Sequence, residues 1–376
     1  MKIIYLANIR FPSERAHATQ IFQNCQSFCK HGCDLILFTN NIYNHKSDKS
    51  AGPSDLKNFF GSNPLFTWNI LLPKKIYFKN KFGFLLREFI FIFHFWSKFK
   101  SEYGNSQTII YSRDEWILAF LSFLLPKQRL VYESHEAKYN LAVRRLIKKQ
   151  IPMIVISEGI KDFYKQKNVP LQQMLVAQDG IDESFFTPHV TKTQARKELN
   201  LDPSNFTVIY VGGFDKWKGV ETFLRASTLS TDVKFVAIGG SESEISNLKK
   251  YYPRVIFLGR KPYTKLPIYQ QAADVLVVPN SATTKLGSEY TSPLKLFAHM
   301  TSGVPVVASN VKSLTSVLGY SYPYLFEADD EESLLHVIKK IRADYNSAKL
   351  QAKKIMEKSE KFTWDKRVAS IINFIK

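Results

Sequence analysis

Residues 289–310 read EYTSPLKLFAHMTSGVPVVASN and predict a loop, a short helix and a buried strand. Ser292 suits the N-cap of the helix, and Pro293 suits its first position. Gly303 is typical of a residue that ends a helix. Lys295 then falls in the first helical turn, where the positive end of the helix dipole disfavours a cation. A nearby anion would explain why a lysine stands there.

The same order of strand, loop and helix extends through the second half of the chain. Helices are predicted over 219–228 and 243–251, between apolar runs that read as buried strands. A strand, a helix and another strand in succession predict a parallel sheet covered on both faces. The predicted strands are 206–212, 233–240, 254–259, 274–279 and 304–309.

The first half repeats this alternation, so the sequence predicts two doubly wound α/β domains joined near 182–194. Three helices are expected over 16–32, 116–125 and 158–166. The predicted strands are 2–7, 34–39, 108–112, 129–134 and 153–157.

Two strand ends in the second half favour an anion. Gly212 and Gly213 follow a strand and precede Lys218, and Lys295 follows the loop after the strand 274–279. Backbone N–H groups and a lysine at each place would bind phosphate. The alternative is that each lysine extends to water independently. GxxxxGK[ST] and GxGxxG are both absent, which argues against a Walker nucleotidase and a simple dehydrogenase.

The chain has 376 residues and a formal net charge of +19. There are 25 basic and 15 acidic residues up to Glu183, and 27 and 18 after it. Both halves are therefore basic, which favours nucleotides, nucleic acid or an anionic membrane as partners. No recognised nucleic-acid-binding motif is present, which argues against nucleic acid.

One basic and aromatic-rich segment, residues 73–100, carries seven basic residues and one acid. Such a helix can lie in an anionic membrane interface. It can equally cover the first sheet with its lysines in solvent, and the sequence leaves both interpretations open.

The ends and the cysteines set further limits. The N-terminal MKIIYLANIR predicts a strand rather than a signal peptide, and no apolar run reaches the roughly 18 residues that span a bilayer. Cys25, Cys29 and Cys33 do not form a disulfide framework for a chain of this length. No fourth ligand stands near them, so buried thiols are favoured over a metal cluster.

Several blocks together resemble a retaining glycosyltransferase of family 4. In the second half these are VGGFDKWKGVETFLRA, VAIGGSESEISNL and TSPLKLFAHMTSGVPVVAS. In the first half RFPSERAHATQIFQNC, VYESHE, IVISEGIKDFY and VAQDGIDESFF resemble the family's earlier blocks. FTWDKRVASIINFI resembles its terminal helix, and 45–105 is the main stretch that the resemblance leaves out.

The resemblance implies the GT-B fold, with two Rossmann-like domains facing a central cleft. The N-terminal, acceptor-binding domain would comprise 1–187, with the terminal helix 362–376 packed back on it. The C-terminal domain, 188–361, would bind the nucleotide sugar. The implied reaction moves a sugar from a UDP- or GDP-linked donor to a saccharide or lipid-linked acceptor in surface polysaccharide or glycolipid synthesis. We expect it in the cytoplasm, with peripheral contact at the inner membrane face.

The resemblance also assigns site residues. Lys218 matches the family lysine on the diphosphate, and His135 matches the histidine near the donor sugar, so both are expected to be catalytic. The implied acceptor contacts are Arg10, His17 and Glu136. No cofactor and no metal ion are expected, because cationic side chains neutralise the leaving diphosphate. The implied donor contacts are Gly212, Gly213, Lys216, Lys218, Glu289, Ser292, Pro293, Leu294 and Lys295.

Two positions depart from the family pattern. Many members carry arginine at the position of Gly213, where Lys216 is a possible substitute. Relatives of the SPLKLF type usually carry a glutamate at Ala298, which accepts hydrogen bonds from the ribose. Its loss would cost roughly 1.5 to 3 kcal/mol of donor binding. Two alternatives stay open: a GT-B subunit that binds a partner transferase or membrane without catalysis, and a nucleotide-sugar epimerase.

Overall fold

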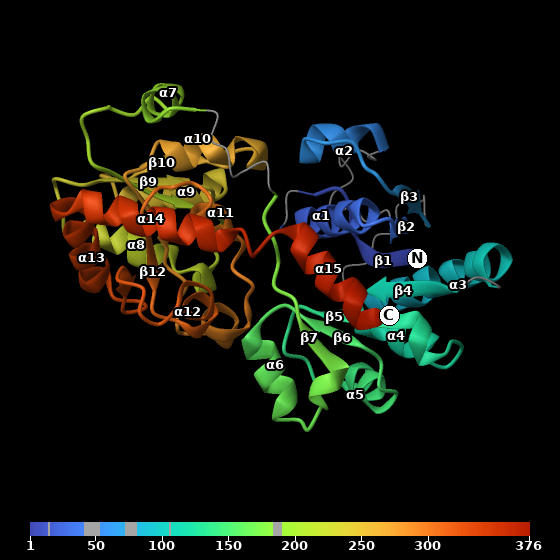
Figure 1. Ribbon diagram of the computed structural model, residues 1–376. Helices are drawn as coiled ribbons and strands as arrows, with labels where there is room; N and C mark the ends of the chain where they lie inside the picture. The colour runs from blue at the N-terminus through green and yellow to red at the C-terminus, as the bar shows by residue number, and fades with distance from the viewer. Residues whose placement is uncertain (14–15, 41–52, 72–80, 105–106, 183–189) are drawn as a thin grey trace. The chain divides into compact units, whose positions relative to one another are not determined.

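The structure, a computed structural model, describes residues 1–13, 16–40, 53–71, 81–104, 107–182 and 190–376. The chain divides into two compact units (Figure 1). The first comprises Met1–Ile156, Ile160–Gln178 and Trp364–Lys376, and the second comprises Ser157–Gly159 and Asp179–Thr363. The C-terminal helix therefore belongs to the first unit, and the chain passes into the second unit at Asp179.

The first unit contains a seven-stranded sheet in the order β3-β2-β1-β4-β5-β6-β7. All the pairings are parallel, as the apolar runs predict. Two short strands, β3 and β7, were not predicted. The strands are β1 (Lys2–Arg10), β2 (Asp34–Asn40), β3 (Thr67–Ile70), β4 (Thr108–Ser112), β5 (Leu130–Ser134), β6 (Met153–Val155) and β7 (Met174–Val176).

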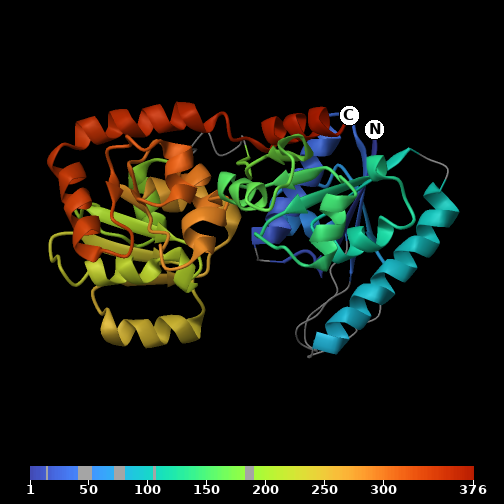
Figure 2. The same ribbon diagram turned by 90° about the horizontal axis from the view of Figure 1, so that it is seen from below.

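Helices cover both faces of this sheet. Phe22 and Phe28 of α1 are fully buried, and α1 also packs against α15. On the long helix α3, Phe95 packs edge-on against Phe38 of β2, and Figure 2 shows this helix in cyan. The helices are α1 (Ala16–Lys30), α2 (Pro53–Phe60), α3 (Lys81–Tyr103), α4 (Glu115–Leu121), α5 (Leu141–Lys148), α6 (Glu158–Lys165, whose first two residues fall in the second unit) and α15 (Trp364–Ile375).

The second unit contains a six-stranded parallel sheet in the order β10-β9-β8-β11-β12-β13. The chain builds outward from β8 on one side and from β11 on the other. The carboxyl ends of these two strands therefore form the switch point, where open α/β sheets bind ligands. The strands are β8 (Thr207–Val211), β9 (Lys234–Ile238), β10 (Ile256–Gly259), β11 (Val275–Val278), β12 (Val306–Ser309) and the short, unpredicted β13 (Leu325–Phe326).

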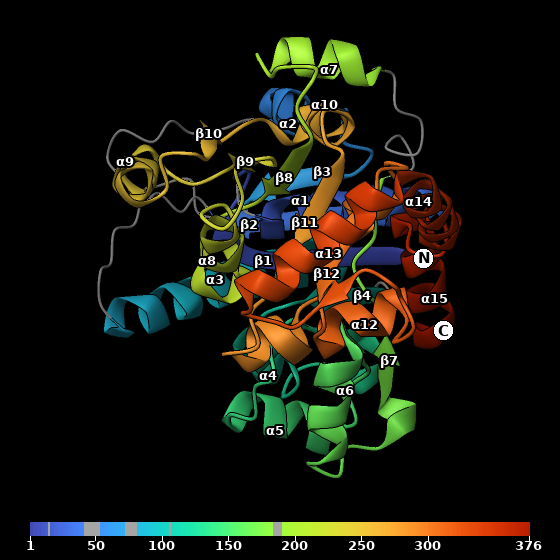
Figure 3. The ribbon, with the colours of Figure 1, turned by 90° about the vertical axis from the view of Figure 1, so that its left-hand side faces the viewer.

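Helices again lie on both sides of the sheet, with α8 and α9 drawn on one side and α10 and α14 on the other in Figure 3. The predicted two-sheet α/β class is thus confirmed. The helices are α7 (Lys192–Glu198), α8 (Val220–Ala226), α9 (Glu242–Tyr251), α10 (Leu266–Gln271), α11 (Leu294–Met300), α12 (Lys312–Leu318), α13 (Glu331–Ala343) and α14 (Tyr345–Ser359).

The start of α11 differs from the prediction. Pro293 is the N-cap rather than the first helical residue, and it has φ −85° and ψ 75°. The hydroxyl of Ser292 caps nothing in α11, because it accepts a hydrogen bond from the backbone N–H of Asp179 at 2.8 Å. The helix ends at Met300 and has seven residues. Lys295 still lies in its first turn.

None of the helices that the structure describes combines the length and the apolar character needed to cross a bilayer. This holds for α3, whose 23 residues are interrupted by charged side chains.

Candidate functional site

The two glycines after β8 let two lysines approach the backbone closely. Gly212 has φ +153°, and a Cβ there would lie 3.0 Å from Cδ and 3.2 Å from Nζ of Lys295. A Cβ on Gly213 would lie 2.8 Å from Nζ of Lys218. The two ammonium groups therefore lie over consecutive glycines at the carboxyl end of the central strand. Side chains at either position would displace them.

Lys295 is held by an aromatic side chain of the same strand. Its Nζ lies 4.5 Å from the centre of the Tyr210 ring and 3.3 Å from the Tyr210 hydroxyl. The hydroxyl in turn donates to the carbonyl of Gly213 at 2.6 Å. Tyr210 itself is fully buried. The aromatic face and the hydroxyl oxygen support an ammonium group without neutralising it.

Lys218 has a carboxylate partner. Its Nζ contacts Oδ2 of Asp215 at 2.6 Å, and Asp215 is largely exposed. The hydrogen bond from Lys218 lowers the pKa of Asp215. Lys216, in the same short 3-10 turn, is exposed.

Burial and the charge of Lys218 lower the pKa of Lys295 from 10.5 to about 7, while Asp215 opposes the shift. Two cations thus share one exposed carboxylate. Charging both lysines becomes favourable when an anion enters.

The loop between β11 and α11 contains the other predicted donor contacts. Glu289 lies in a π-helical turn, Leu286–Tyr290, and is partly buried. The N–H of Leu294 donates to the carbonyl of Ser292 at 3.0 Å, so this donor is used within the turn. Ser292 and Pro293 are buried. Lysine ammonium groups, more than backbone donors, therefore define this site.

The two departures from the family pattern have local explanations. At Gly213 the space beside the backbone is taken by the pair of Lys218 and Asp215. Ala298 is buried in the core, and its carbonyl accepts hydrogen bonds from Gln270 Nε2 at 2.6 Å and Thr301 Oγ1 at 2.8 Å. His299 is also buried, and burial followed by the charge of Lys295 lowers its pKa to about 3.

A second polar cluster lies in the first unit, around the carboxyl end of β5. His135 contacts Oε1 of Glu133 through Nε2. Oε2 of Glu133 lies 2.9 Å from Nη2 of Arg367 on α15 and also accepts a hydrogen bond from Tyr111. Asn24 joins the cluster by donating to Glu133 at 3.2 Å and accepting from Arg367 at 2.6 Å. Glu133 and Arg367 are buried.

The charges in this cluster are matched. Burial raises the pKa of Glu133, but Arg367 and then His135 outweigh it and hold the pKa well below its usual range. Burial and the charge of Arg113 lower the pKa of His135 to about 3. His135 is therefore neutral near pH 7, and because a carboxylate can only accept, Nε2 carries the proton and Nδ1 is the acceptor.

Sequence reasoning missed Glu133, Arg367, Asp215 and Tyr210. Glu133 could have been identified from the sequence, because an acid within the apolar run of a buried strand needs a cationic partner. Its partner, Arg367, comes from the far end of the chain, and no local pattern identifies it.

The predicted acceptor contacts are not gathered in one described cluster. His17 lies in the first turn of α1 and is partly buried. Glu136 is exposed and pairs with Lys138 at 3.4 Å. The backbone of Arg10 ends β1, and its side chain lies outside the described part of the chain.

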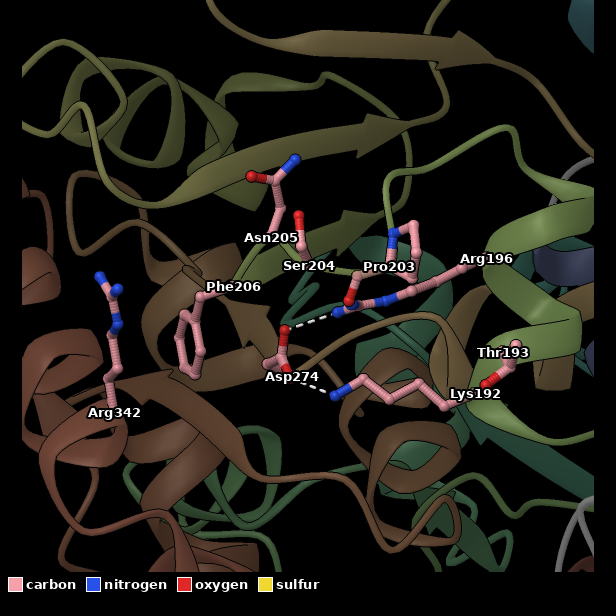
Figure 4. Close-up of a pocket in the computed structure, with 9 residues that line it drawn as sticks. All are labelled: Lys192, Thr193, Arg196, Pro203, Ser204, Asn205, Phe206, Asp274 and Arg342. Atoms are coloured by element: carbon pink, nitrogen blue, oxygen red, sulfur yellow. Dashed lines mark hydrogen bonds and ion pairs between the residues drawn. The ribbon is translucent and has the colours of Figure 1, made fainter.

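Figure 4 shows a pocket of about 370 Å³ at the opposite, amino edge of the second sheet. Asp274 accepts there from Lys192, from Arg196 at 2.6 Å and from the N–H of Thr207 at 2.6 Å. Arg342 stacks on Phe206, 5.5 Å from the ring centre. The buried acid thus has its charge matched by α7, so these contacts fasten α7 to the sheet.

The three cysteines are free; Cys25 and Cys33 are buried, and burial raises the pKa of all three thiols. Among the residues that the structure describes, His, Cys, Asp and Glu form no group of three suited to a metal ion.

Residues 205–344, which contain both lysines, match the family model of the glycosyl transferases group 1. The D-inositol 3-phosphate glycosyltransferase of Corynebacterium aurimucosum is 24% identical over 258 residues, 59% of this chain and 59% of that protein. The lipopolysaccharide core biosynthesis mannosyltransferase of Rhizobium meliloti is 25% identical over 206 residues, 51% and 55% of the two chains. The chain thus spans little more than half the length of these curated relatives.

The structural comparison extends over the whole chain. HepE of Anabaena, in a crystal structure in complex with UDP-glucose, matches with a TM-score of 0.72 and 17% identity, and covers 99% of each chain. At this identity the match establishes the fold. The chain therefore has the GT-B fold that the sequence predicts, built from the two Rossmann-like sheets described above.

Proposed function

We propose that the protein is a retaining glycosyltransferase that moves a sugar from a nucleotide diphosphate sugar to a saccharide or lipid-linked acceptor. The observation that carries this proposal is the pair of ammonium groups, on Lys218 and Lys295, over Gly212 and Gly213. Two cations that share one exposed carboxylate fit the charge of a diphosphate. The glycosyl transferases group 1 match of the same domain supports this reading.

The lysines would act on the leaving group. As the bond from the sugar to the diphosphate breaks, negative charge grows on the phosphate oxygens, and two positioned ammonium groups stabilise it. Lys295 is partly buried beside an aromatic ring, where such stabilisation is stronger than in open solvent. We therefore assign no metal ion and no cofactor to this step. The crystal structure of HepE in complex with UDP-glucose supports UDP as the nucleotide of the donor. GDP is the alternative nucleotide.

The remaining donor contacts are proposed from the resemblance. His135 is assigned to the donor sugar, where its neutral Nδ1 can accept a hydrogen bond from a sugar hydroxyl. The backbone and side chains proposed to hold the rest of the donor are Gly212, Gly213, Lys216, Glu289, Ser292, Pro293 and Leu294.

The acceptor is proposed to be a growing surface polysaccharide or glycolipid, with Arg10, His17 and Glu136 among its contacts. The similarity to a mannosyltransferase of lipopolysaccharide core synthesis supports this class. Because nucleotide sugars are made in the cytoplasm, we place the enzyme there, at the inner face of the membrane.

The predicted membrane contact through 73–100 is kept as part of this proposal. Residues 72–80 lie outside the described residues, and α3 carries the rest. One side of α3 packs on the sheet through Phe95, while Leu86, Phe89 and Phe93 are exposed on the other. Packing on the first sheet and the proposed membrane contact, the two interpretations of the segment, thus concern opposite faces of α3.

The test is to incubate the full chain with a panel of UDP- and GDP-sugars and to measure released nucleotide. We expect one donor to release nucleotide and to raise the Tm at millimolar concentration. Lys218→Ala should strongly reduce both effects, while Lys249→Ala, which removes an exposed lysine of α9, should retain most of the activity. Free epimerised sugar nucleotide without an acceptor would identify an epimerase. The absence of a Tm shift with every nucleotide would overturn the proposal.

A further inference from the structure

Helix α4 and the turn after it expose a row of large apolar side chains. Trp116 and Phe120 lie one turn apart on α4, Phe123 and Leu124 follow in the turn after it, and all four side chains are exposed. Phe123 is 71% exposed. The opposite face, with Ile117, Leu118 and Leu121, is buried in the first unit. A soluble helix normally places polar residues where this row lies.

The adjoining helix α5 is basic on its exposed face. Arg144, Lys148 and Lys149 are exposed there, together with Leu141 at the start of the helix, 71% exposed. Residues 116–132 and 141–149 have six basic residues and no acid, and Glu115, the first residue of α4, is buried. In the described part of the chain, no carboxylate lies within ion-pair distance of Arg144, Lys148 or Lys149.

Arg145 joins the apolar row to the basic face. Its guanidinium carbon lies 3.1 Å from the centre of the Phe123 ring, and its Nε donates to Oγ of Ser122 at 2.7 Å. A pocket of about 230 Å³ lies beside this junction, between the end of α4 and the end of α5. Lys127 and Lys149 line it, together with Ser122, Leu125 and Pro126. Cations therefore flank the exposed rings.

We propose that this surface of α4 and α5 binds an anionic lipid membrane. Phe123 and Leu124 enter the interfacial region, while Lys127, Lys148 and Lys149 contact lipid phosphates. Aromatic and leucine side chains next to lysines and arginines are the composition that binds such interfaces. A neutral protein partner would use the apolar row but would leave the acid-free basic face without a role.

The inference rests on the proposed function only in that a lipid-linked acceptor lies in a membrane. The contact itself needs no catalysis and does not involve α3. Its test can therefore fail while the glycosyltransferase activity stands, and the reverse.

The experiment is co-sedimentation of the full chain with vesicles of phosphatidylglycerol and phosphatidylcholine, compared with phosphatidylcholine alone. We expect binding to the anionic vesicles only, and weaker binding at high salt. Lys148→Glu with Lys149→Glu should reduce binding at least about tenfold, because each basic residue near the surface contributes about fivefold. The matched control is Lys249→Glu with Lys250→Glu, an exposed lysine pair on α9.

The apolar part is tested by Phe123→Ser and, in a second protein, by Leu141→Ser. Each should weaken vesicle binding about tenfold or more, since each removes a large apolar side chain from the interface. Leu350→Ser, at an exposed leucine of α14, is the control, and Phe93→Ser separates any contribution of α3. The Tm of each variant and nucleotide release without vesicles should stay unchanged.

Two results would overturn the proposal. One is equal binding of the wild type to neutral and anionic vesicles, or no loss in the lysine pair variant. The other is a dimer in light scattering that Phe123→Ser dissociates, with vesicle binding unaffected, because the row would then be a contact between two copies of the chain.

Discussion

The two polar clusters at the carboxyl ends of β5 and β8 handle charge in opposite ways. Around Glu133 the charges are matched inside the protein, by Arg367 and by hydrogen bonds from Tyr111 and Asn24. Around Lys295 they are not, since burial and a second lysine both lower its pKa. A cluster with matched charges stabilises the fold, whereas a cluster with unmatched cations favours the binding of an anionic ligand. The contrast gives four experiments.

The largest expected effect is on stability, at the matched cluster. Arg367→Met leaves the buried carboxylate of Glu133 without its cation, which should cost about 3 to 5 kcal/mol of unfolding free energy. Denaturant titration measures this loss. The double variant with Glu133→Gln should recover at least half of it, because the uncompensated charge is gone. Lys218→Met should cost less than about 1 kcal/mol, as an exposed ion pair does. A loss of unfolding free energy below about 1 kcal/mol for Arg367→Met would contradict the contrast between the matched and the unmatched cluster.

The second experiment removes the unmatched charges. Lys218→Ala or Lys295→Ala should each weaken the binding of UDP or GDP about ten- to a hundredfold, since a hydrogen bond to a charged group contributes roughly 1.5 to 3 kcal/mol. Isothermal titration calorimetry gives the Kd. Lys249→Ala carries the same change in net charge at an exposed position of α9, so its Kd should change by less than about threefold. Equal losses in all three variants would mean that net charge, rather than placement, determines affinity.

The fold of both units was predictable because buried parallel strands are nearly continuous apolar runs, as in KIIYLA and FTVIYV. The missed strands, β3, β7 and β13, have four, three and two residues, too few to show a pattern. In the proposed donor site, the glycines and lysines lie within short segments at strand ends, so topology alone brings them to one edge. Arg367 is different, because it lies 343 positions from Asn24, to which it donates. Such a partner is fixed by tertiary packing.

The third experiment uses pH. With its pKa lowered to about 7, Lys295 loses its proton in the free protein as the pH rises above 7. Nucleotide affinity should therefore fall about fivefold between pH 7 and 8, and further to pH 9, because only the charged lysine attracts the diphosphate. Stability of the free protein should change in the opposite sense. Between about 7 and 10.5 the unfolded chain binds the extra proton, so this contribution to stability rises with pH. Lys295→Met should remove both trends, and their persistence would exclude Lys295 as the titrating group.

The smallest effect is expected at Asp215, the carboxylate that pairs with Lys218. Asp215 contacts Lys218 in the same place that a diphosphate would occupy, so it competes with the ligand for that ammonium group. Asp215→Asn should therefore tighten nucleotide binding, in contrast to Glu133→Gln, which leaves Arg367 unpaired and should destabilise the first unit. The gain should be at most about fivefold, because an exposed ion pair contributes roughly 0.2 to 1 kcal/mol. Asp232→Asn, at the exposed pair with Arg342, makes the same change in charge elsewhere in the second unit and should leave the Kd unchanged. Weaker binding in Asp215→Asn would mean that the carboxylate positions Lys218 for the ligand, and the cluster around Lys218 and Lys295 would then be matched as well.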